Sequence, residues 1–473
     1  MKKILSYLSL LLPVLFFSQC NIVEGDYFDF GLKSESDIKI VMIDNDGLYL
    51  KSTLADERMG QRKFVVRKFN AQNKLTDLYL QNFPVIDSKA YDDYLGSFAS
   101  SEKVVFFNTS YYGKAGKLSL HRSVFDKNLN KFTTSIVESF PIESALKSGN
   151  TQFAISENDK YASIVYYAPS SRKEPQKITV FVYETNSTEI LWKKEISLND
   201  GASIRYIAVS NTGTVIITRD PYKGSSRIVS VSKESTDETQ LPEGVFLFQP
   251  YLFSKGSEQF LFSLVSSNKF IKENKDAILI YDLSNNKIVS IAKIIEYQNI
   301  KENEKIFIRK ISYQNQQFQV FTEAKLEAGK VTKVDAFGSP SAFPETIYKY
   351  SKGFVFAFDN DGALKNKYQL GYESFANGYD LYRSYGVVGY EGNYVYISDN
   401  SYNSMVHLSS ENFKPTSFEL IKESCTKTGN IQNGNVMIKQ NIEYIPKTKD
   451  FIFLQILNDK ATIVKASGYK LSN

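Results

Sequence analysis

Short strand-forming segments alternate with polar turns throughout this chain, and residues 151–220 show the pattern most completely. Segments rich in Ile, Val, Tyr, Phe and Thr are separated there by the turn clusters ENDK, ETNS and SNTG. β-Branched and aromatic residues favour strands, whereas Asn, Asp, Gly and Ser favour the turns between them. The pattern therefore predicts consecutive antiparallel hairpins, and no long amphipathic helical pattern interrupts them.

The same turn-and-strand unit recurs along the chain. A polar turn followed by an aromatic or β-branched strand is found at Asp46, Ser101, Asn158, Thr212, Gly256, Asn315, Gly392 and Thr448. Most intervals lie between about 44 and 59 residues, and one is about 77 residues long. A four-stranded propeller blade takes about 40 to 50 residues, and insertions in outer loops lengthen it. The longest interval holds a further hairpin, residues 353–370, which could belong to a blade of its own.

Burial favours closing these units into a ring. Strands such as KITVFVY and AILIYDL are apolar on both faces, so a single sheet cannot bury them alone. We therefore predict an all-β fold: a single β-propeller of seven or eight four-stranded blades, with six possible. A pair of two-sheet sandwiches or an elongated β-solenoid is the alternative.

This pattern resembles the β-propeller superfamily, in particular its divergent secreted bacterial members. The resemblance covers nearly all of the mature chain, but it carries no regular WD dipeptide and no kelch double glycine. No functional residue is therefore transferred from a named family.

The N-terminus has the pattern of a secretion signal. Lys2 and Lys3 precede an apolar run over residues 4–17, which is shorter than the roughly 20 residues that span a bilayer. Phe17-Ser18-Gln19-Cys20 resembles a bacterial lipoprotein signal, in which the cysteine receives the lipid. Phe17 and Gln19 depart from the usual residues there, so simple cleavage near Gln19 is the alternative.

These features divide the chain into a signal peptide (1–19), a tether (20–36) and one propeller domain (37–473). The expected location is the outer membrane or cell surface, with a membrane contact through lipidated Cys20, or else the periplasm or the medium. If Cys20 carries lipid, Cys425 is a lone thiol, since the chain has 2 cysteines, and a disulfide between the two is the alternative.

The charge balance argues against nucleic acid as a partner. The formal net charge is +5, and removal of Lys2 and Lys3 with the signal leaves about +3. Lys and Glu are interspersed, as in SSRKEPQK, so no concentrated basic face is indicated.

Few residues carry recognisable catalytic chemistry. The chain has 2 histidines, His121 and His407, which is too few for a zinc site of several histidines. No G-x-S-x-G, G-x-G-x-x-G or CxxC motif is present, so we predict no cofactor and no metal. Either histidine could still assist a serine or a carboxylate, although a structural role in a strand is the simpler interpretation. The tetrads beginning at Asp44 and Asp359 lack the acids of a calcium loop and are interpreted as hairpin turns.

Two hypotheses for function follow. The first is a non-catalytic binding or scaffold module for a protein or glycan, and the residues proposed to bind lie in a tyrosine-rich stretch: Tyr379, Asp380, Tyr382, Arg383 and Tyr385. Tyrosine offers a flat apolar body with a polar tip, although packing between blades is the simpler interpretation of this stretch. The alternative is a carbohydrate-active enzyme with paired carboxylates at the propeller mouth, with these acids as candidates: Asp87, Asp92, Asp93, Glu143 and Asp380. Catalysis is thus left open, and the small number of recognisable catalytic residues favours a non-enzyme. A purely structural envelope protein is a third interpretation.

Overall fold

In the computed structural model, the described residues are 21–30, 35–44, 47–56, 61–85, 91–112, 116–144, 147–169, 175–198, 202–220, 224–266, 277–294, 304–314, 316–331, 345–370, 374–376, 385–390, 393–398, 404–408, 415–419, 436–437, 442–457 and 460–467. The regular elements in these ranges are β-strands. The same ranges include no helix that is long and apolar enough to cross a membrane.

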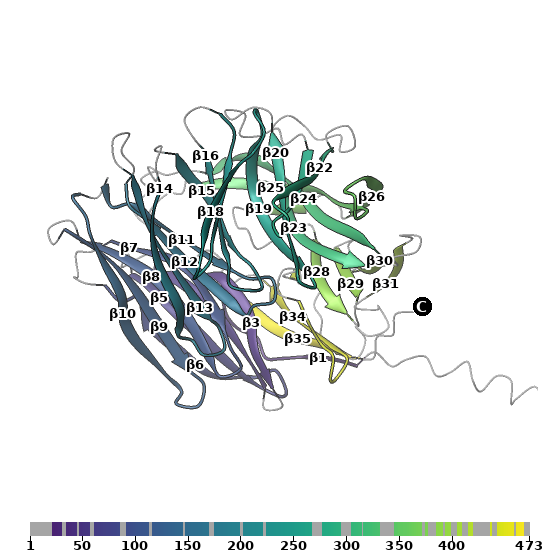
Figure 1. The fold of residues 1–473 in the computed structure, drawn as a ribbon. Helices are drawn as coiled ribbons and strands as arrows, with labels where there is room; N and C mark the ends of the chain where they lie inside the picture. Colours follow the sequence, from purple (N-terminus) through teal and green to yellow (C-terminus); the bar gives the residue numbers. More distant parts are fainter. Residues whose placement is uncertain are drawn as a thin grey trace, which may run out of the picture.

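The described strands pair into eight antiparallel sheets, here called blades 1 to 8, which are arranged as a propeller (Figure 1). Blade 1 consists of β3 (Glu35–Asp44), β4 (Gly47–Asp56), β5 (Gln61–Asn70) and β6 (Leu75–Asn82), and blade 2 of β7 (Tyr91–Ala99), β8 (Lys103–Tyr112), β9 (Lys117–Asp126) and β10 (Lys131–Pro141). Blade 3 consists of β11 (Asn150–Ile155), β12 (Tyr161–Tyr167), β13 (Gln176–Glu184) and β14 (Ile190–Leu198), and blade 4 of β15 (Ser203–Val209), β16 (Val215–Asp220), β17 (Arg227–Val231) and β18 (Thr236–Gln240).

The second half of the chain forms blades 5 to 8. Blade 5 consists of β19 (Phe246–Lys255), β20 (Glu258–Ser266), β21 (Ala277–Asp282) and β22 (Lys287–Lys293), and blade 6 of β23 (Glu304–Gln314), β24 (Gln317–Val331), β25 (Glu345–Phe358), β26 (Leu364–Leu370) and β27 (Ser374–Ala376). Blade 7 consists of β28 (Tyr385–Tyr390), β29 (Asn393–Ser398), β30 (Ser404–Leu408) and β31 (Pro415–Glu419). Blade 8 consists of β32 (Val436–Met437), β33 (Glu443–Ile445), β34 (Asp450–Leu457) and β35 (Lys460–Ser467), and the N-terminal strands β1 (Asn21–Glu24) and β2 (Phe28–Asp29) pair with β35 in the same sheet.

The predicted repeat corresponds to the blades. Each of the eight predicted turns lies between the first and second strands of a blade, or between β33 and β34 in blade 8. The predicted all-β propeller is therefore confirmed. The hairpin at residues 353–370 does not form a blade of its own: β25 pairs with β24 as well as with β26, so the hairpin belongs to blade 6. Two long strands, β24 with 15 residues and β25 with 14 residues, contribute to the extra length of this repeat.

The hydrophobic core lies between blades and alternates along each strand. In β13, Ile178 and Val180 pack toward blade 4, whereas Phe181 and Tyr183 pack toward blade 2. Successive strand residues point to opposite faces of a sheet, so an unbroken apolar run supplies both interfaces. Each such buried side chain contributes about 1.5–3 kcal/mol to folding, which explains how the ring is stabilised by burial.

Both ends of the described chain meet in blade 8, where β1 lies beside β35 (Figure 1). Gly25 N–H donates to the carbonyl of Ile463 at 2.9 Å, and Thr462 Oγ1 donates to the carbonyl of Gly25 at 2.8 Å. The sequence pattern predicts a tether over residues 20–36, but strands β1 and β2 lie within this range. The short segment NIVE was not recognised because its pairing depends on the distant edge of β35 rather than on a local hairpin.

The turn at Asp359 behaves as predicted for a hairpin. The Asp359 carboxylate accepts the backbone N–H groups of Asp361 and Ala363 at 3.1 and 2.8 Å. Gly362 has a φ of 76°, a left-handed conformation that glycine adopts without strain. This Asp-centred turn connects β25 to β26, the third and fourth strands of blade 6, whereas Asp44 opposes Gly47 at the hairpin between β3 and β4, the first and second strands of blade 1.

Candidate functional site

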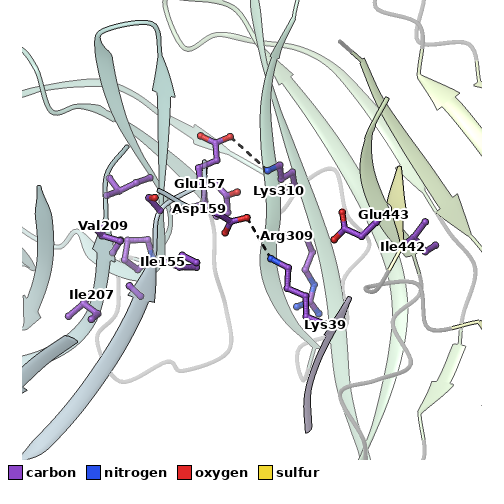
Figure 2. Close-up of a pocket in the computed structure, with 16 residues that line it drawn as sticks. Lys39, Ile155, Glu157, Asp159, Ile207, Val209, Arg309, Lys310, Ile442 and Glu443 are labelled. Carbon is purple, nitrogen blue, oxygen red and sulfur yellow. Dashed lines mark ion pairs between the residues drawn. The ribbon is translucent and has the colours of Figure 1, made fainter. Parts of the chain in front are cut away.

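The first strands of the blades surround a central opening. From β3 to β7, β11, β15, β19 and β23, each first strand contacts the next, and β28 contacts β33. A cavity of about 620 Å³ lies among β3, β11, β15, β19, β23 and β33 (Figure 2). A second cavity of about 570 Å³ lies between β3 and β7. The two share Lys39, Ile155, Asp159 and Glu443, and together they are called the axial site below.

β-Bulges shape the wall of the axial site. The register shifts along the first strands of blades 1, 2, 4, 5 and 6, and β11 pairs with β12 without a shift. A bulge adds an unpaired residue and redirects its side chain, which is why bulges are frequent beside functional sites. Asp37, Leu95, Pro250 and Arg309 lie within these shifts and line the two cavities.

The β11–β12 turn of blade 3 reaches across the opening. Asp159 pairs with Lys39 of blade 1 at 3.6 Å, and Glu157 pairs with Lys310 of blade 6 at 3.9 Å. Glu157 also accepts the backbone N–H of Ser254 in blade 5 at 3.4 Å. Blade 3 is not adjacent to any of these blades, so the contacts are made across the axis. Figure 2 shows the two carboxylates between the opposing walls.

Two carboxyl groups of the axial site are partly removed from water. Burial raises the pKa of Glu157, and the Lys310 ammonium and the Ser254 N–H oppose that shift. Burial also raises the pKa of Glu443, where Lys39 opposes the shift and Asp159 adds to it. Each of these groups holds its proton to a higher pH than an exposed glutamate does. The axial site therefore combines apolar wall residues with carboxylates and cations facing one space.

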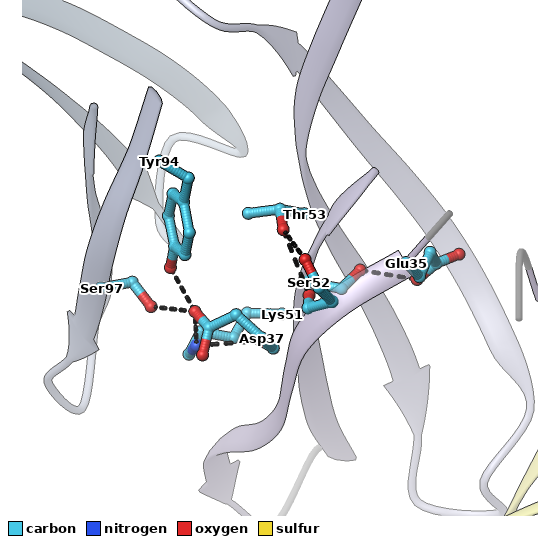
Figure 3. Close-up of polar contacts among 8 residues, drawn as sticks. Glu35, Asp37, Lys51, Ser52, Thr53, Tyr94 and Ser97 are labelled. Atoms are coloured by element: carbon cyan, nitrogen blue, oxygen red, sulfur yellow. Dashed lines mark hydrogen bonds and ion pairs between the residues drawn. The ribbon is translucent and has the colours of Figure 1, made fainter. Parts of the chain in front are cut away.

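A polar cluster around Asp37 joins blades 1 and 2 beside the second cavity (Figure 3). The Asp37 carboxylate accepts hydrogen bonds from Lys51 Nζ at 2.5 Å, from Ser97 Oγ at 2.7 Å and from the Tyr94 hydroxyl. Lys51 is 2% exposed, and burial lowers its pKa although Asp37 opposes that shift. Burial and the Asp37 charge both raise the pKa of Tyr94. Because the Asp37 carboxylate already accepts these three hydrogen bonds, it serves to hold the strands of the two blades together rather than to react.

Arg309 is held against the wall by a buried partner. Its Nε and Nη2 atoms lie 2.7 and 2.6 Å from Oε2 of Glu323, which is 1% exposed. This pair lies within blade 6, between β23 and β24. The guanidinium charge is therefore balanced within its own blade.

The tyrosine-rich residues proposed from the sequence are not tested by the structure. Tyr379, Asp380, Tyr382 and Arg383 lie outside the described residues, as does Cys20. Tyr385 begins β28, and its side chain is outside the description. The proposed ligand contacts of this stretch and the lipidation of Cys20 remain predictions.

The acids proposed from the sequence are not brought together where they are described. Asp92 and Asp93 both lie near Arg62, at 3.7 and 3.4 Å, and Glu143 pairs with Lys147 at 2.6 Å. These three acids line neither cavity of the axial site. Asp87 and Asp380 lie outside the described residues.

His121 forms a pair with Ser110 inside blade 2, with Ser110 Oγ 2.7 Å from His121 Nε2. Ser110 is 0% exposed and His121 is 3% exposed, and burial lowers the pKa of His121 to about 4. Neither residue lines the axial site. The structural interpretation of this histidine therefore agrees with its position, and His407 lies in β30 with its side chain outside the description.

The charged residues of the axial site could not be recognised from the sequence pattern. Asn158-Asp159-Lys160 was identified as a turn, but a hairpin pattern does not reveal that the turn faces the axis. Lys39, Lys310 and Glu443 occupy ordinary strand positions, and only the closed ring brings them together. Among the described residues, no group of three or more His, Cys, Asp or Glu side chains is placed to hold a metal ion.

Comparisons with known proteins identify no family for this chain. No family model matches the chain, and no curated protein matches it. Among solved structures, it is similar to a prolyl endopeptidase (10% identity, TM-score 0.40, 90% of this chain and 55% of that one) and to the β-propeller domain of the trilobed protease from Pyrococcus furiosus (10%, 0.36, 84% and 98%). It is also similar to the Dos1 propeller (11%, 0.34, 60% and 65%).

The chain spans 55% to 58% of the length of the peptidases that it matches. At identities of 10% or 11%, these similarities concern the propeller fold alone.

Proposed function

We propose that this protein is a non-catalytic binding module that holds a segment of a partner protein in the axial site. The observation that carries the proposal is the cavity of about 620 Å³, whose lining comes from six blades and combines apolar residues with both acids and cations. Ligand sites have volumes of about 300–1,000 Å³ and combine an apolar lining with a few polar groups. A polypeptide segment presents this same mixture of apolar side chains and charges.

A protein segment suits this lining better than a glycan does. The described lining of the larger cavity includes one aromatic residue, Tyr251. Aliphatic surface there comes from Ile155, Ile207, Val209 and Leu252. Sugar rings are usually held by flat aromatic faces, but aliphatic surface serves apolar side chains of a peptide. A glycan partner therefore remains the second ligand to test.

Selection from a displayed library of random dodecapeptides tests the proposal. We expect peptides to be enriched on the purified domain, and to lose affinity when both Glu157→Gln and Lys310→Gln are introduced. Lys177→Gln, at an exposed position of β13, is the matched control and should leave affinity unchanged. Enrichment of peptides that ignore the axial variants, or no enrichment at all, would overturn the proposal.

A second candidate is glycoside hydrolysis by carboxylates of the same site. Glu157, Asp159 and Glu443 line one cavity, and burial raises the pKa of both glutamates. A glycosidase needs one protonated and one ionised carboxyl group on either side of the sugar bond, and a raised pKa suits the acid. Release of reducing sugar from a polysaccharide panel, abolished by Glu443→Gln, would support this activity. Binding of glycans without product would count against it.

We also propose that the protein is exported and anchored to a membrane through lipid on Cys20. The basic and apolar N-terminal segment supports export, and Cys20 at its end supports the anchor. Because β1 begins at Asn21, a lipid on Cys20 would hold blade 8 close to the membrane. Labelling with radioactive palmitate should mark the wild type and not Cys20→Ala. Unlabelled mature protein in the medium would reject the anchor.

A further inference from the structure

At one position of the axial site, two acidic side chains lie near a single lysine. Lys39 extends from β3, Asp159 lies in the β11–β12 turn, and Glu443 begins β33. Lys39 Nζ is 3.6 Å from Asp159 Oδ2, and the Glu443 carboxyl group interacts electrostatically with both residues. Lys39 therefore forms an ion pair with Asp159, and Glu443 from another blade lines the same space, at the place where the two cavities meet.

Around the described part of the axial site, each of the three other cations is paired with one carboxylate. Lys310 pairs with Glu157, Arg309 with Glu323 and Lys51 with Asp37. The excess negative charge among the described residues consequently lies at Lys39, Asp159 and Glu443. In a partly desolvated site such an excess favours a ligand with one positive charge.

Building on the proposed binding function, we propose that the axial site selects a lysine or arginine side chain of the partner segment and seats its cation beside Glu443 and Asp159. Ile155 and Ile442 line the same cavity and offer apolar surface to the methylene groups of that side chain. Figure 2 shows Glu443 and Asp159 on opposite sides of the space, with Lys39 between them. An acidic segment would instead meet the excess negative charge and be repelled.

Fluorescence anisotropy with four pools of labelled heptapeptides tests this selection. The six outer positions are randomised over uncharged residues other than cysteine, and the central residue is Lys, Arg, Gln or Glu. We expect the Lys and Arg pools to bind at least about tenfold more tightly than the Gln and Glu pools, a ratio that corresponds to about 1.4 kcal/mol.

Two variants should change that ratio in opposite directions. Glu443→Gln removes the excess charge and should abolish the preference for Lys and Arg. Lys39→Gln removes the competing cation and should increase the preference. Glu102→Gln, an exposed residue in the β7–β8 turn, is the control and should leave the ratio unchanged.

The outcomes separate this inference from the function on which it rests. Equal binding of all four pools would overturn the selection of a cation and leave peptide binding intact. A preference for the Glu pool, or a preference that persists in Glu443→Gln, would also overturn it. Binding of none of the pools would overturn the peptide-binding function itself.

Discussion

Replacing Arg67 with methionine should weaken the junction between blade 1 and the N-terminal segment. Arg67 Nη1 and Nη2 donate to the two carboxylate oxygens of Glu35, one of them at 2.9 Å, and the two side chains are 6% and 1% exposed. The Arg67 guanidinium also lies 5.4 Å from the ring of Phe28 and 5.9 Å from that of Phe30. These contacts connect blade 1 to the segment that closes the ring.

The magnitude follows from the charge that is left behind. Removing one partner of a buried ion pair costs about 3–5 kcal/mol, because the remaining charge is buried without compensation. Replacing both Glu35 and Arg67 with methionine removes both charges, and the Ser52 hydroxyl then loses its acceptor at a cost of about 1 kcal/mol. We therefore expect a loss of about 3–5 kcal/mol for each single variant and of at most about 2 kcal/mol for the double variant.

Urea unfolding measures these free energies. Far-ultraviolet circular dichroism follows all blades, and fluorescence of Trp192, the single tryptophan, follows blade 3. Because the blades share their cores, we expect both signals to report the same shift for a change in blade 1. A single variant that costs less than about 1 kcal/mol, or a double variant as unstable as the sum of the singles, would refute the reasoning.

Two further changes test other parts of the structure. His121 has a pKa of about 4 in the folded protein and an ordinary pKa near 6.5 when unfolded, so the unfolded state binds more protons between these values. The free energy of unfolding should consequently fall by about 3 kcal/mol because of His121 as the pH drops from about 6.5 to about 4. Unfolding curves taken across that range should show no such loss for His121→Gln. Equal slopes of the free energy of unfolding against pH for the two proteins would contradict this expectation. A Cβ at Gly25 would lie 2.0 Å from the carbonyl oxygen of Asn73, so Gly25→Ala should destabilise the ring by about 1–3 kcal/mol. Asp26→Ala, at the exposed neighbouring residue, should change the melting temperature little, and equal effects of the two changes would count against the closure.

Local patterns were sufficient to predict the blades, because each turn and strand is specified by nearby residues. The turn at Asn158 and the strand containing Phe181 were recognised in this way, and the apolar character of both faces of the strand predicted its two interfaces. Pairing between distant segments was not predictable. Asn21–Glu24 becomes a strand because β35 offers an edge about 440 residues later, and nothing in the local sequence indicates that edge.

The candidate site was harder to predict for the same reason. Lys39, Glu157 and Glu443 are far apart in the sequence and resemble ordinary charged residues on a strand or turn. Their proximity depends on the number of blades and on bulges that redirect single residues, such as the shift between Ile308 and Lys310. The stretch around Tyr382 was proposed as a binding site because of its tyrosine content. The described site is instead defined by the position of its residues around the propeller axis.

Photo-crosslinking tests most directly whether a partner segment occupies the axial site. A benzophenone side chain is placed at Tyr251, which lines the larger cavity, or at Leu191, which is 47% exposed on the outer strand β14. A peptide selected on the wild-type domain is then irradiated with each protein, and the products are identified by mass spectrometry. We predict crosslinks from position 251 and none from position 191. Crosslinks from the outer strand alone would contradict the account.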